Sequence, residues 1–344
     1  MIDNNCCASS GSCCADSAVQ AEIQTVSTEL AFGDICGAWK ARWGIGRMNY
    51  IVGPGIYAVG NPDKASPVLL SANYKLSFDT LRKNLSGLDC WILVIDTKGV
   101  NVWCAAGEGT FGTDELVNRI EAVGLDGIVA HKNIIVPQLG ASGVCGYEVT
   151  KRTGFSVIFG PVRASDIKEF ITANCKATKE MRTVKFTFRD RLVLTPIELT
   201  EIGKASLMVF GVMFLINLFA ARPFGLYDFL VYVAAVVLGA VITPILLPVL
   251  PGKAFSFKGW VLGAIVMALI LWSLGWFEPP FLLLGMGYIL ALPAYSGFLA
   301  MNFTGASTYT SPSGVLKEMR IAIPFIVIAM AAGIVLVLIK TFTG

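Results

Sequence analysis

The fold of the first half of the chain is decided by residues 90–107, which read CWILVIDTKGVNVWCAAG. The run 90–95 is apolar throughout, which predicts a short, fully buried strand. Similar patterns predict strands at 134–136 and 155–159, and helices near 78–85, 114–123 and 165–175. Because strands and helices alternate, we expect an α/β domain with an open, mostly parallel sheet covered by helices.

Two further local predictions concern the ends of elements. Thr113, followed by Asp114 and Glu115, is expected to cap the helix near 114–123 and to place acids in its first turn. Residues 181–194 are expected to form a strand, at a sheet edge, that leads into the second half of the chain.

The loop after the strand at 90–95 is the expected ligand site, because ligands on such sheets gather beyond the carboxyl ends of strands. It contains Cys104, and the glycines that follow permit close approach of the backbone to a ligand. The alternative is an inert thiol buried beside Trp103. The glycines lack the Lys-Ser/Thr pair of a phosphate-binding loop. The single histidine, His131, gives no support for a hydrolase.

The second half of the chain is nearly free of charge over long runs. The whole chain is 55% hydrophobic and 15% charged, whereas soluble domains carry about a quarter charged residues. Helices of about 17 to 22 apolar residues can cross a bilayer, so we expect an all-α transmembrane bundle of about five helices. The expected spans are 205–221, 229–250, 259–277, 281–300 and 321–339.

Three segments are therefore expected: a flexible, Cys-rich segment (1–45), an α/β domain (46–200) and a transmembrane domain (201–344). The nine cysteines lack the spacing of a disulfide framework, and free thiols persist in reducing compartments, so the α/β domain is expected in the cytoplasm. Lys and Arg are more frequent in the loops on that side of the membrane, which predicts an outside C-terminus.

Composition also narrows the function classes. The formal net charge of +3 and the absence of basic runs interleaved with aromatics argue against a nucleic-acid partner. The expected spans contain no ionisable residue, which favours anchoring in membrane lipid over transport.

The stretch Asn101-Val102-Trp103-Cys104-Ala105-Ala106-Gly107 resembles the signature of the mercury-methylation corrinoid proteins, the HgcA family: Asn-(Val/Ile)-Trp-Cys-Ala-(Ala/Gly)-Gly-Lys. A run of this length that contains Trp and Cys is far more specific than a glycine motif. The likeness extends to 109–116, 72–76, 137–140 and 303–311, and covers most of the chain from about Pro54 onward. The order of a corrinoid domain followed by five spans also matches.

The resemblance implies a corrinoid-dependent methyltransferase with a cobalamin-type cofactor. In the family the motif cysteine is the lower axial ligand of cobalt, a role that carries over to Cys104. Sulfur ligation favours transfer of a carbanion-like methyl group to Hg(II), which gives methylmercury, while the protein orients and tunes the cofactor. The residues expected at the cofactor are Asn101, Val102, Trp103, Cys104, Ala105, Ala106, Gly107, Gly109, Thr110, Asn73 and Gln138.

The resemblance also implies partners. The reductant would be an HgcB-type, ferredoxin-like protein with two 4Fe–4S clusters, and the methyl donor would be of the folate type. This chain carries no cluster motif of its own, which agrees with an external reductant.

One position departs from the signature, because Glu108 stands where the family has Lys. The acceptor is therefore open, and the alternatives are a paralogue that methylates another thiophilic element, such as arsenic, or a corrinoid methyl carrier without terminal transfer. Paired thiols near the N-terminus could capture a soft metal for either acceptor, although they lack zinc-site spacing; the alternative is a tail with incidental cysteines. These thiols are Cys6, Cys7, Cys13 and Cys14.

Overall fold

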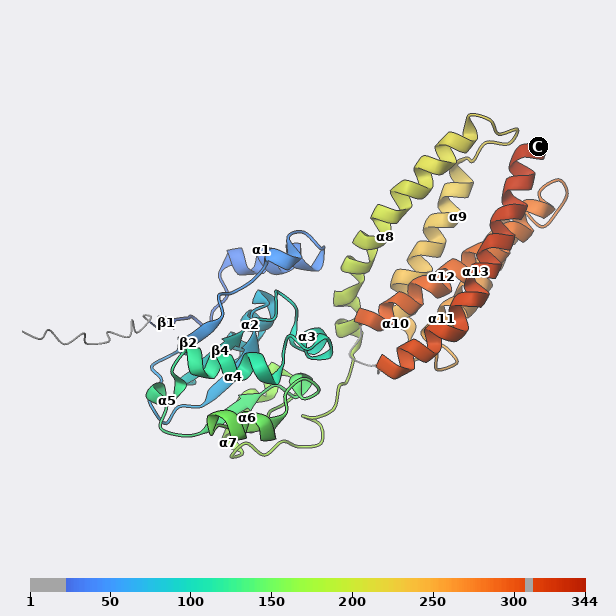
Figure 1. The fold of residues 1–344 in the computed structure, drawn as a ribbon. Helices are drawn as coiled ribbons and strands as arrows, with labels where there is room; N and C mark the ends of the chain where they lie inside the picture. Colours follow the sequence, from blue (N-terminus) through green and yellow to red (C-terminus); the bar gives the residue numbers. More distant parts are fainter. Residues whose placement is uncertain (1–22, 307–311) are drawn as a thin grey trace, which may run out of the picture.

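The computed structural model describes residues 23–306 and 312–344, and these form an α/β domain followed by a helical bundle (Figure 1). The N-terminal cysteines at 6, 7, 13 and 14 lie outside the described residues, as do residues 307–311 of the stretch resembling the family before the fifth span.

The elements of the α/β domain are β1 (Gln24–Thr25), α1 (Phe32–Arg42), η1 (Arg47–Asn49), β2 (Gly55–Val59), β3 (Val68–Ala72), α2 (Lys75–Arg82), β4 (Cys90–Ile95), α3 (Val102–Glu108), α4 (Thr113–Ala122), α5 (Leu125–Ile128), β5 (Asn133–Val136), η2 (Gln138–Gly140), α6 (Gly146–Thr153), β6 (Ser156–Phe159), η3 (Ala164–Asp166) and α7 (Ile167–Thr172). The strands form one sheet in the order β1-β2-β4-β3-β5-β6. Within the described residues β2 pairs antiparallel with β4 and every other pairing is parallel. The expectation of a mostly parallel α/β sheet is confirmed.

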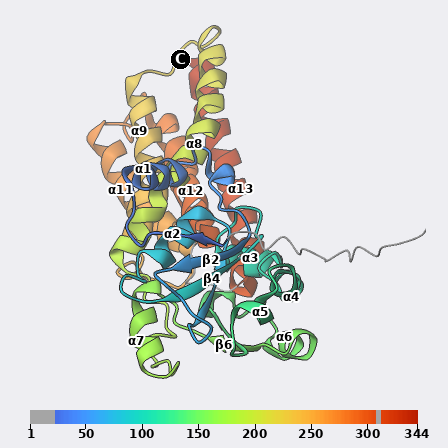
Figure 2. The ribbon, with the colours of Figure 1, turned by 90° about the vertical axis from the view of Figure 1, so that its left-hand side faces the viewer.

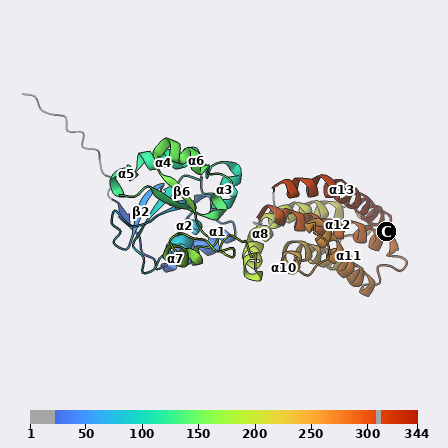
Figure 3. The ribbon, with the colours of Figure 1, turned by 90° about the horizontal axis from the view of Figure 1, so that it is seen from below.

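Helices cover both faces of this sheet (Figure 3). Alternate residues of β4 pack on opposite sides: Leu93 contributes to a core with α3, α4 and α6, and Ile92 to a core with α2 and α7. All of β4 is buried, as expected for a central strand with both faces covered. The chain leaves β3 toward one face and the neighbouring β4 toward the other, so a crevice opens at their carboxyl ends.

Three expectations for this domain are wrong. The N-terminal segment is not flexible up to residue 45, because β1 and α1 are formed within it. Thr113 does not cap α4: it is the first helical residue, and its hydroxyl accepts a hydrogen bond from the backbone N–H of Cys145. Residues 181–194 form no strand, because a capping box between Thr187 and Asp190 starts a long helix there.

The bundle contains α8 (Phe188–Asn217), α9 (Leu226–Val237), a π-helical turn η4 (Leu238–Ile242), α10 (Thr243–Leu246), α11 (Phe255–Ser273), α12 (Leu282–Ala306) and α13 (Pro312–Thr343). Among the described residues, five helices are long and apolar enough to cross a membrane, as expected. The π-helical turn ends two residues before Pro244. Helix α8 begins well before residue 205 and runs without interruption across the expected boundary at 200/201.

One buried acid departs from the expectation that the spans hold no ionisable group. The second helix begins at Leu226, so it includes Asp228, which is 1% exposed. Its carboxylate contacts Arg222 at 3.2 Å and accepts a hydrogen bond from Tyr288 at 2.7 Å. These contacts compensate the buried charge and fit a structural role at the end of the bundle away from the α/β domain.

The two parts of the molecule meet at the start of α8 (Figures 1 and 2). Phe186, just before α8, packs with Leu247, Phe255 and Phe303 from the near end of the bundle. Because successive spans alternate in direction, the loop that carries Lys253 and the start of α13, which carries Lys317 and Arg320, lie at this same end.

Candidate functional site at the carboxyl ends of the strands

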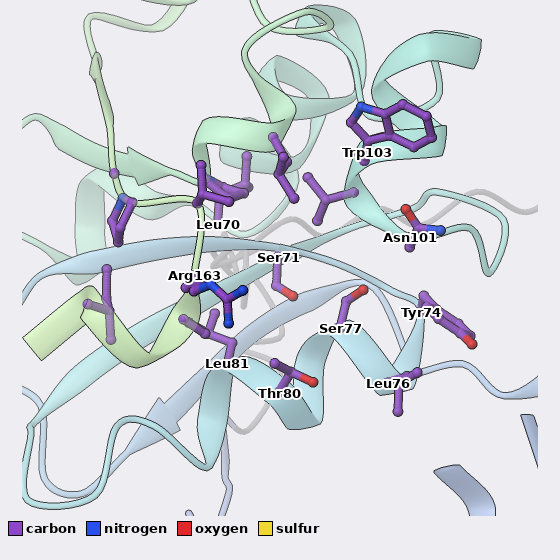
Figure 4. A pocket seen from close by; sticks show the side chains of 18 of the residues that line it. Leu70, Ser71, Tyr74, Leu76, Ser77, Thr80, Leu81, Asn101, Trp103 and Arg163 are labelled. Atoms are coloured by element: carbon purple, nitrogen blue, oxygen red, sulfur yellow. The ribbon is translucent and has the colours of Figure 1, made fainter. Parts of the chain in front are cut away.

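A cavity of about 330 Å³ lies beyond the carboxyl ends of the central parallel strands. It is lined by Leu70 and Ser71 of β3, by Ser77 and Thr80 of α2, and on the opposite side by the start of α3 with Trp103 (Figure 4). This is the place at which open α/β sheets bind ligands. The volume is at the lower end of the range of about 300–1,000 Å³ usual for ligand sites.

Residues near the membrane complete the cavity. Val193, Leu194 and Ile197 from the first turns of α8 line it, together with Arg42 at the end of α1. Burial lowers the pKa of the Arg42 guanidinium. Its Nε is buried and has no hydrogen-bond partner among the described residues. The Arg42 guanidinium thus brings a positive charge to the wall of the cavity, which a ligand with acceptor groups would complement.

Asn101 caps the short helix that carries Cys104. Its Oδ1 accepts a hydrogen bond from the backbone N–H of Cys104 at 3.1 Å, and its Nδ2 donates to Cys104 Sγ at 3.3 Å. The helix ends at Gly109, whose φ of +87° is a left-handed conformation that favours glycine.

Cys104 is a free, half-buried thiol that does not itself line the cavity, but its Sγ lies 3.3 Å from Nδ2 of Asn101, which does. Asn101, Val102 and Trp103 line the cavity directly, and Cys104 is the next residue. The Cys104 sulfur is thus not enclosed in the core. Cys90, by contrast, is fully buried: burial, with a smaller effect of Asp89, raises the pKa of its thiol to about 12. The inert, buried alternative describes Cys90 rather than Cys104.

Asn73 positions the loop that leads to α3. It is buried, and its Oδ1 accepts hydrogen bonds from Thr97 N (3.1 Å), Thr97 Oγ1 (2.8 Å) and Gly99 N (3.0 Å). Its Nδ2 donates to Asp96 at 2.8 Å. Because these contacts use its oxygen and one amide hydrogen, the structure places Asn73 under the site as a support and not on the cavity wall.

The two alanines of the motif serve packing. Ala105 is fully buried and Ala106 nearly so, and both belong to the core between α3, α4 and the sheet. A Cβ at Gly143 would lie 3.1 Å from Ala106 Cα and 2.1 Å from the backbone oxygen of Phe111. Small residues are therefore required for α3 to approach its neighbours, and neither alanine lines the cavity.

The glycines after the motif leave open space beside Cys104. Gly107, Glu108 and Gly109 are exposed, and a Cβ at either glycine would meet no atom within 4 Å. Thr110 is half-buried, and its hydroxyl donates to the backbone oxygen of Ala105 at 3.4 Å. The surface at the end of α3, one helical turn beyond Cys104, is thus open.

Gln138 does not line the cavity, although its neighbours Pro137 and Leu139 do. Its Oε1 accepts a hydrogen bond from Arg182 at 2.7 Å. Gly140 packs against the ring of Phe111, where a Cβ would come within 2.4 Å. His131 lies at the amino end of β5, where its Nε2 is 2.9 Å from the backbone oxygen of Ser66.

Sequence patterns gave no signal for the polar groups that α1, α2 and the β6 loop bring to the cavity. Ser77 and Thr80 are spaced three apart on α2 and so share one face. Arg163 lines the cavity and donates to Asp190 of α8 at 2.6 Å. Only the adjacency of β3, β5 and β6 brings these residues together.

The residues present fit a corrinoid. A corrin is a broad ring with amide side chains, and it needs an accessible axial donor, open space around that donor and hydrogen-bond donors at its rim. The half-buried Cys104 thiol, the open surface at Gly107 and Gly109, and the guanidinium of Arg42 on the cavity wall meet these needs. A soft sulfur donor suits a transition metal.

The part of the chain that carries this site is similar in sequence to known proteins. The family model of the CO dehydrogenase/acetyl-CoA synthase delta subunit matches residues 47–171. The matched segment contains every strand of the site-bearing sheet except β1. It runs from η1 to α7, and so leaves out α1 and the bundle.

Curated proteins with similar sequences are subunits of one complex. The gamma subunit of the acetyl-CoA decarbonylase/synthase complex from Methanocaldococcus jannaschii is 34% identical over 130 residues, which is 37% of this chain and 26% of that protein. The subunit from Methanopyrus kandleri is 33% identical over 122 residues, 35% of this chain and 26% of that protein. The chain thus spans about a quarter of the length of these relatives. The similarity is consistent with the expected cobalamin-type corrinoid cofactor.

Proposed function

We propose that this chain is a membrane-anchored corrinoid-dependent methyltransferase in which Cys104 is the lower axial ligand of cobalt. One observation supports the proposal: the free, half-buried thiol of Cys104 lies 3.3 Å from Asn101, a residue that lines the cavity at the carboxyl ends of the strands. The similarity to acetyl-CoA decarbonylase/synthase gamma subunits, which are corrinoid methyl-transfer subunits, supports this chemistry at a coarse level.

The residues of the chain would divide the work of holding and orienting the cofactor. When bound, the corrinoid would carry the methyl group and supply its transfer. Asn101 would hold Sγ of Cys104 in place, because it contacts both the backbone and the sulfur of that residue. Trp103 would form one wall, and Arg42 would donate to acceptor groups at the rim.

We propose Hg(II) as the methyl acceptor. The support is the resemblance of the motif to the mercury-methylation corrinoid proteins. Glu108, which replaces the family's Lys, is exposed on the last turn of α3, so its charge faces whatever approaches the open side of Cys104. Another thiophilic element, such as arsenic, is therefore the alternative acceptor, and the four N-terminal cysteines would deliver either.

A second candidate is a corrinoid methyl carrier that hands the methyl group to a partner protein. The observation that favours it is that the curated relatives are subunits of a multisubunit complex. In both candidates the reductant would be an HgcB-type ferredoxin-like protein and the methyl donor would be of the folate type. The α/β domain would face the cytoplasm, because exposed Lys253, Lys317 and Arg320 lie at its end of the bundle.

Absorption spectroscopy tests the role of Cys104. Full-length protein reconstituted with a corrinoid without oxygen is expected to show a visible spectrum that Cys104→Ala changes. Cys145→Ala is the matched control, since Cys145 is an exposed thiol outside the cavity, and it should leave the spectrum unchanged. An unchanged spectrum in Cys104→Ala rules out the axial role, and failure to retain cobalt rules out both candidates.

Product analysis tests the acceptor. Methylated protein is incubated with Hg(II) or with arsenite, and the extractable methylated products are identified. Methylmercury alone supports the first candidate, and methylated arsenic alone supports the paralogue. Transfer to neither element, with transfer to a partner protein, supports the carrier. Glu108→Lys is expected to change the rate of transfer, whereas Glu121→Lys, at an exposed position on α4, should not.

A further inference from the structure

Helix α1 turns its apolar side outward. Phe32 is 81% exposed and Trp39 is 63% exposed, and Ile35 and Trp43 lie on the same side because they follow at helical spacing. The turn after the helix adds exposed Ile45 and Met48. We name these six residues the α1 face. Soluble surfaces rarely gather large apolar side chains in this way, so a contiguous patch marks an interaction site.

The inward side of α1 is held by specific contacts, so its orientation is well defined. Asp34 accepts hydrogen bonds from Lys75 at 2.6 Å and from Arg82 at 2.7 Å. Gly37 lies against the ring of Tyr50, where a Cβ would come within 2.5 Å, and Ala41 is fully buried. A half-turn rotation of α1 would hide the apolar face but would break this set of contacts.

The end of α1 lies against α8 just before the bundle becomes apolar (Figure 1). The hydroxyl of Thr200 is 3.2 Å from the backbone oxygen of Trp43. Lys204 is the last charged residue before Arg222, and it lies four positions after Thr200, about 6 Å along the helix axis. The headgroup layer on each side of the hydrocarbon is about 5–7 Å thick. Trp43 is therefore at headgroup level when α8 spans a bilayer.

The chemistry of the α1 face suits this layer. Trp is favoured at membrane interfaces, and apolar helix faces bind there when cations flank them. Lys40 is exposed on α1, and exposed Lys253 and Lys317 lie at the same end of the bundle. These cations would attract anionic headgroups.

We propose that the α1 face lies in the headgroup layer of the membrane as an interfacial helix. Because the end of α1 contacts the spanning helix α8 just before its apolar part, we take lipid as the partner of the α1 face. The inference does not depend on the bound cofactor or the acceptor, and α1 lies outside the segment that matches the family. Arg42 of α1 lines the cavity, so the contact would hold the cavity close to the membrane surface.

Photo-crosslinking in a bilayer tests this placement. Full-length protein is reconstituted in nanodiscs of phosphatidylcholine and phosphatidylglycerol, with Trp39 or Ile45 replaced by p-benzoylphenylalanine. Leu207, which is 73% exposed on α8 above Lys204, is the positive control. Tyr147, an equally exposed aromatic on α6, is the matched negative control. Mass spectrometry of the irradiated protein then identifies lipid adducts.

Lipid adducts at Trp39 and Ile45 in yields within a few-fold of Leu207, and their absence at Tyr147, are the expected result. The absence of adducts at both α1 positions while Leu207 forms them overturns the proposal. Crosslinks to another protein in native membranes, without lipid adducts, also overturn it and assign the face to a protein partner. Trp39→Glu should lower the adduct yield at Ile45, whereas Tyr147→Glu should not.

Discussion

The side-chain amide of Asn101 holds Cys104 at two points, because Oδ1 accepts from its backbone N–H at 3.1 Å and Nδ2 donates to its Sγ at 3.3 Å. The first contact is an ordinary helix cap. The second is specific to a sulfur three residues later and orients that sulfur. Capping and positioning of the sulfur can therefore be separated by mutation.

Asn101→Asp keeps the cap acceptor but loses the donor to Sγ, whereas Asn101→Ala loses both. We expect Asn101→Ala to lower stability by about 1 kcal/mol and Asn101→Asp to lower it by less. Both should alter the spectrum of the corrinoid-loaded protein. Thermal unfolding and absorption measure the two effects. A native spectrum in Asn101→Asp would show that the contact to sulfur has no positioning role.

Gly143→Ala tests the close packing behind α3. Its Cβ would lie 2.1 Å from the backbone oxygen of Phe111, so we expect a loss on the order of 2 kcal/mol and weaker corrinoid binding. Gly107→Ala is the matched control for stability, because its Cβ meets nothing within 4 Å and alanine favours a helix by about 0.5–1 kcal/mol. If Gly107 contacts the corrin ring, Gly107→Ala will still weaken corrinoid binding. An unchanged affinity for the corrinoid would show that Gly107 does not contact the ring.

Asn73→Ala should destabilise the loop that carries α3. Three donors, from Thr97 and Gly99, would lose their acceptor in a buried site, which costs about 2–3 kcal/mol. Asn118→Ala, at an exposed position of α4, should be close to neutral. The unfolding midpoint of the full-length protein measures the difference. Equal midpoints for the two variants would contradict the supporting role.

Acid should weaken the attachment of α1. The hydrogen bond from Lys75 outweighs the opposing effect of burial, and with Arg82 and the backbone of Ala31 it lowers the pKa of Asp34 from 3.8 to about 2. A lowered pKa stabilises the fold above the unfolded value, and this contribution is lost as the pH falls from about 4 toward about 2. Asp34→Asn should cost on the order of 1 kcal/mol near neutral pH, because solvent partly screens the pair.

The stability gap between wild type and Asp34→Asn should therefore close as unfolding is measured at successively lower pH. Glu121→Gln provides the comparison, since Glu121 is exposed on α4 and makes no ion pair among the described residues. A gap that stays constant through acidification would mean that Asp34 contributes by packing and not by charge.

Thiol labelling should distinguish the cysteines. Iodoacetamide at about pH 8 is expected to modify Cys104 and Cys145 but not Cys90, whose pKa is raised to about 12 by burial. Bound corrinoid should protect Cys104 and leave Cys145 reactive. Mass spectrometry of peptides measures each site. Modification of Cys104 at the same rate with and without corrinoid would place the cofactor elsewhere.

Much of the fold could be predicted because its central elements are strongly patterned. The apolar run of β4 and the long apolar spans leave few alternatives. The strand expected at 181–194 was wrong because alternating Val184, Phe186 and Phe188 imitate a strand, while the capping box of Thr187 decides the outcome. Strands β2 and β3 were not predicted, although both lie inside the sheet, because five-residue runs carry little periodicity.

The candidate site was predictable only in its local part. The resemblance put Asn101 and Cys104 together at the cofactor, and in the structure the two residues are in contact. The roles of Asn73 and Arg42 depend on contacts between residues far apart in the chain, which no local pattern encodes. Ala105 and Ala106 were expected at the cofactor because they are small, but their size serves core packing.

Helix α8 has consequences for how the membrane can act on the cavity. Its first turns form one wall through Val193 and Ile197, and the same continuous helix then faces lipid from Leu207 onward. At Pro196 the helix loses a backbone donor, and the hydroxyl of Thr195 compensates by donating to the oxygen of Leu192 at 2.9 Å. A thicker or thinner bilayer would change the tilt of the lipid-facing part of α8. Because α8 is continuous, this tilt would also move its first turns and change the volume of the cavity.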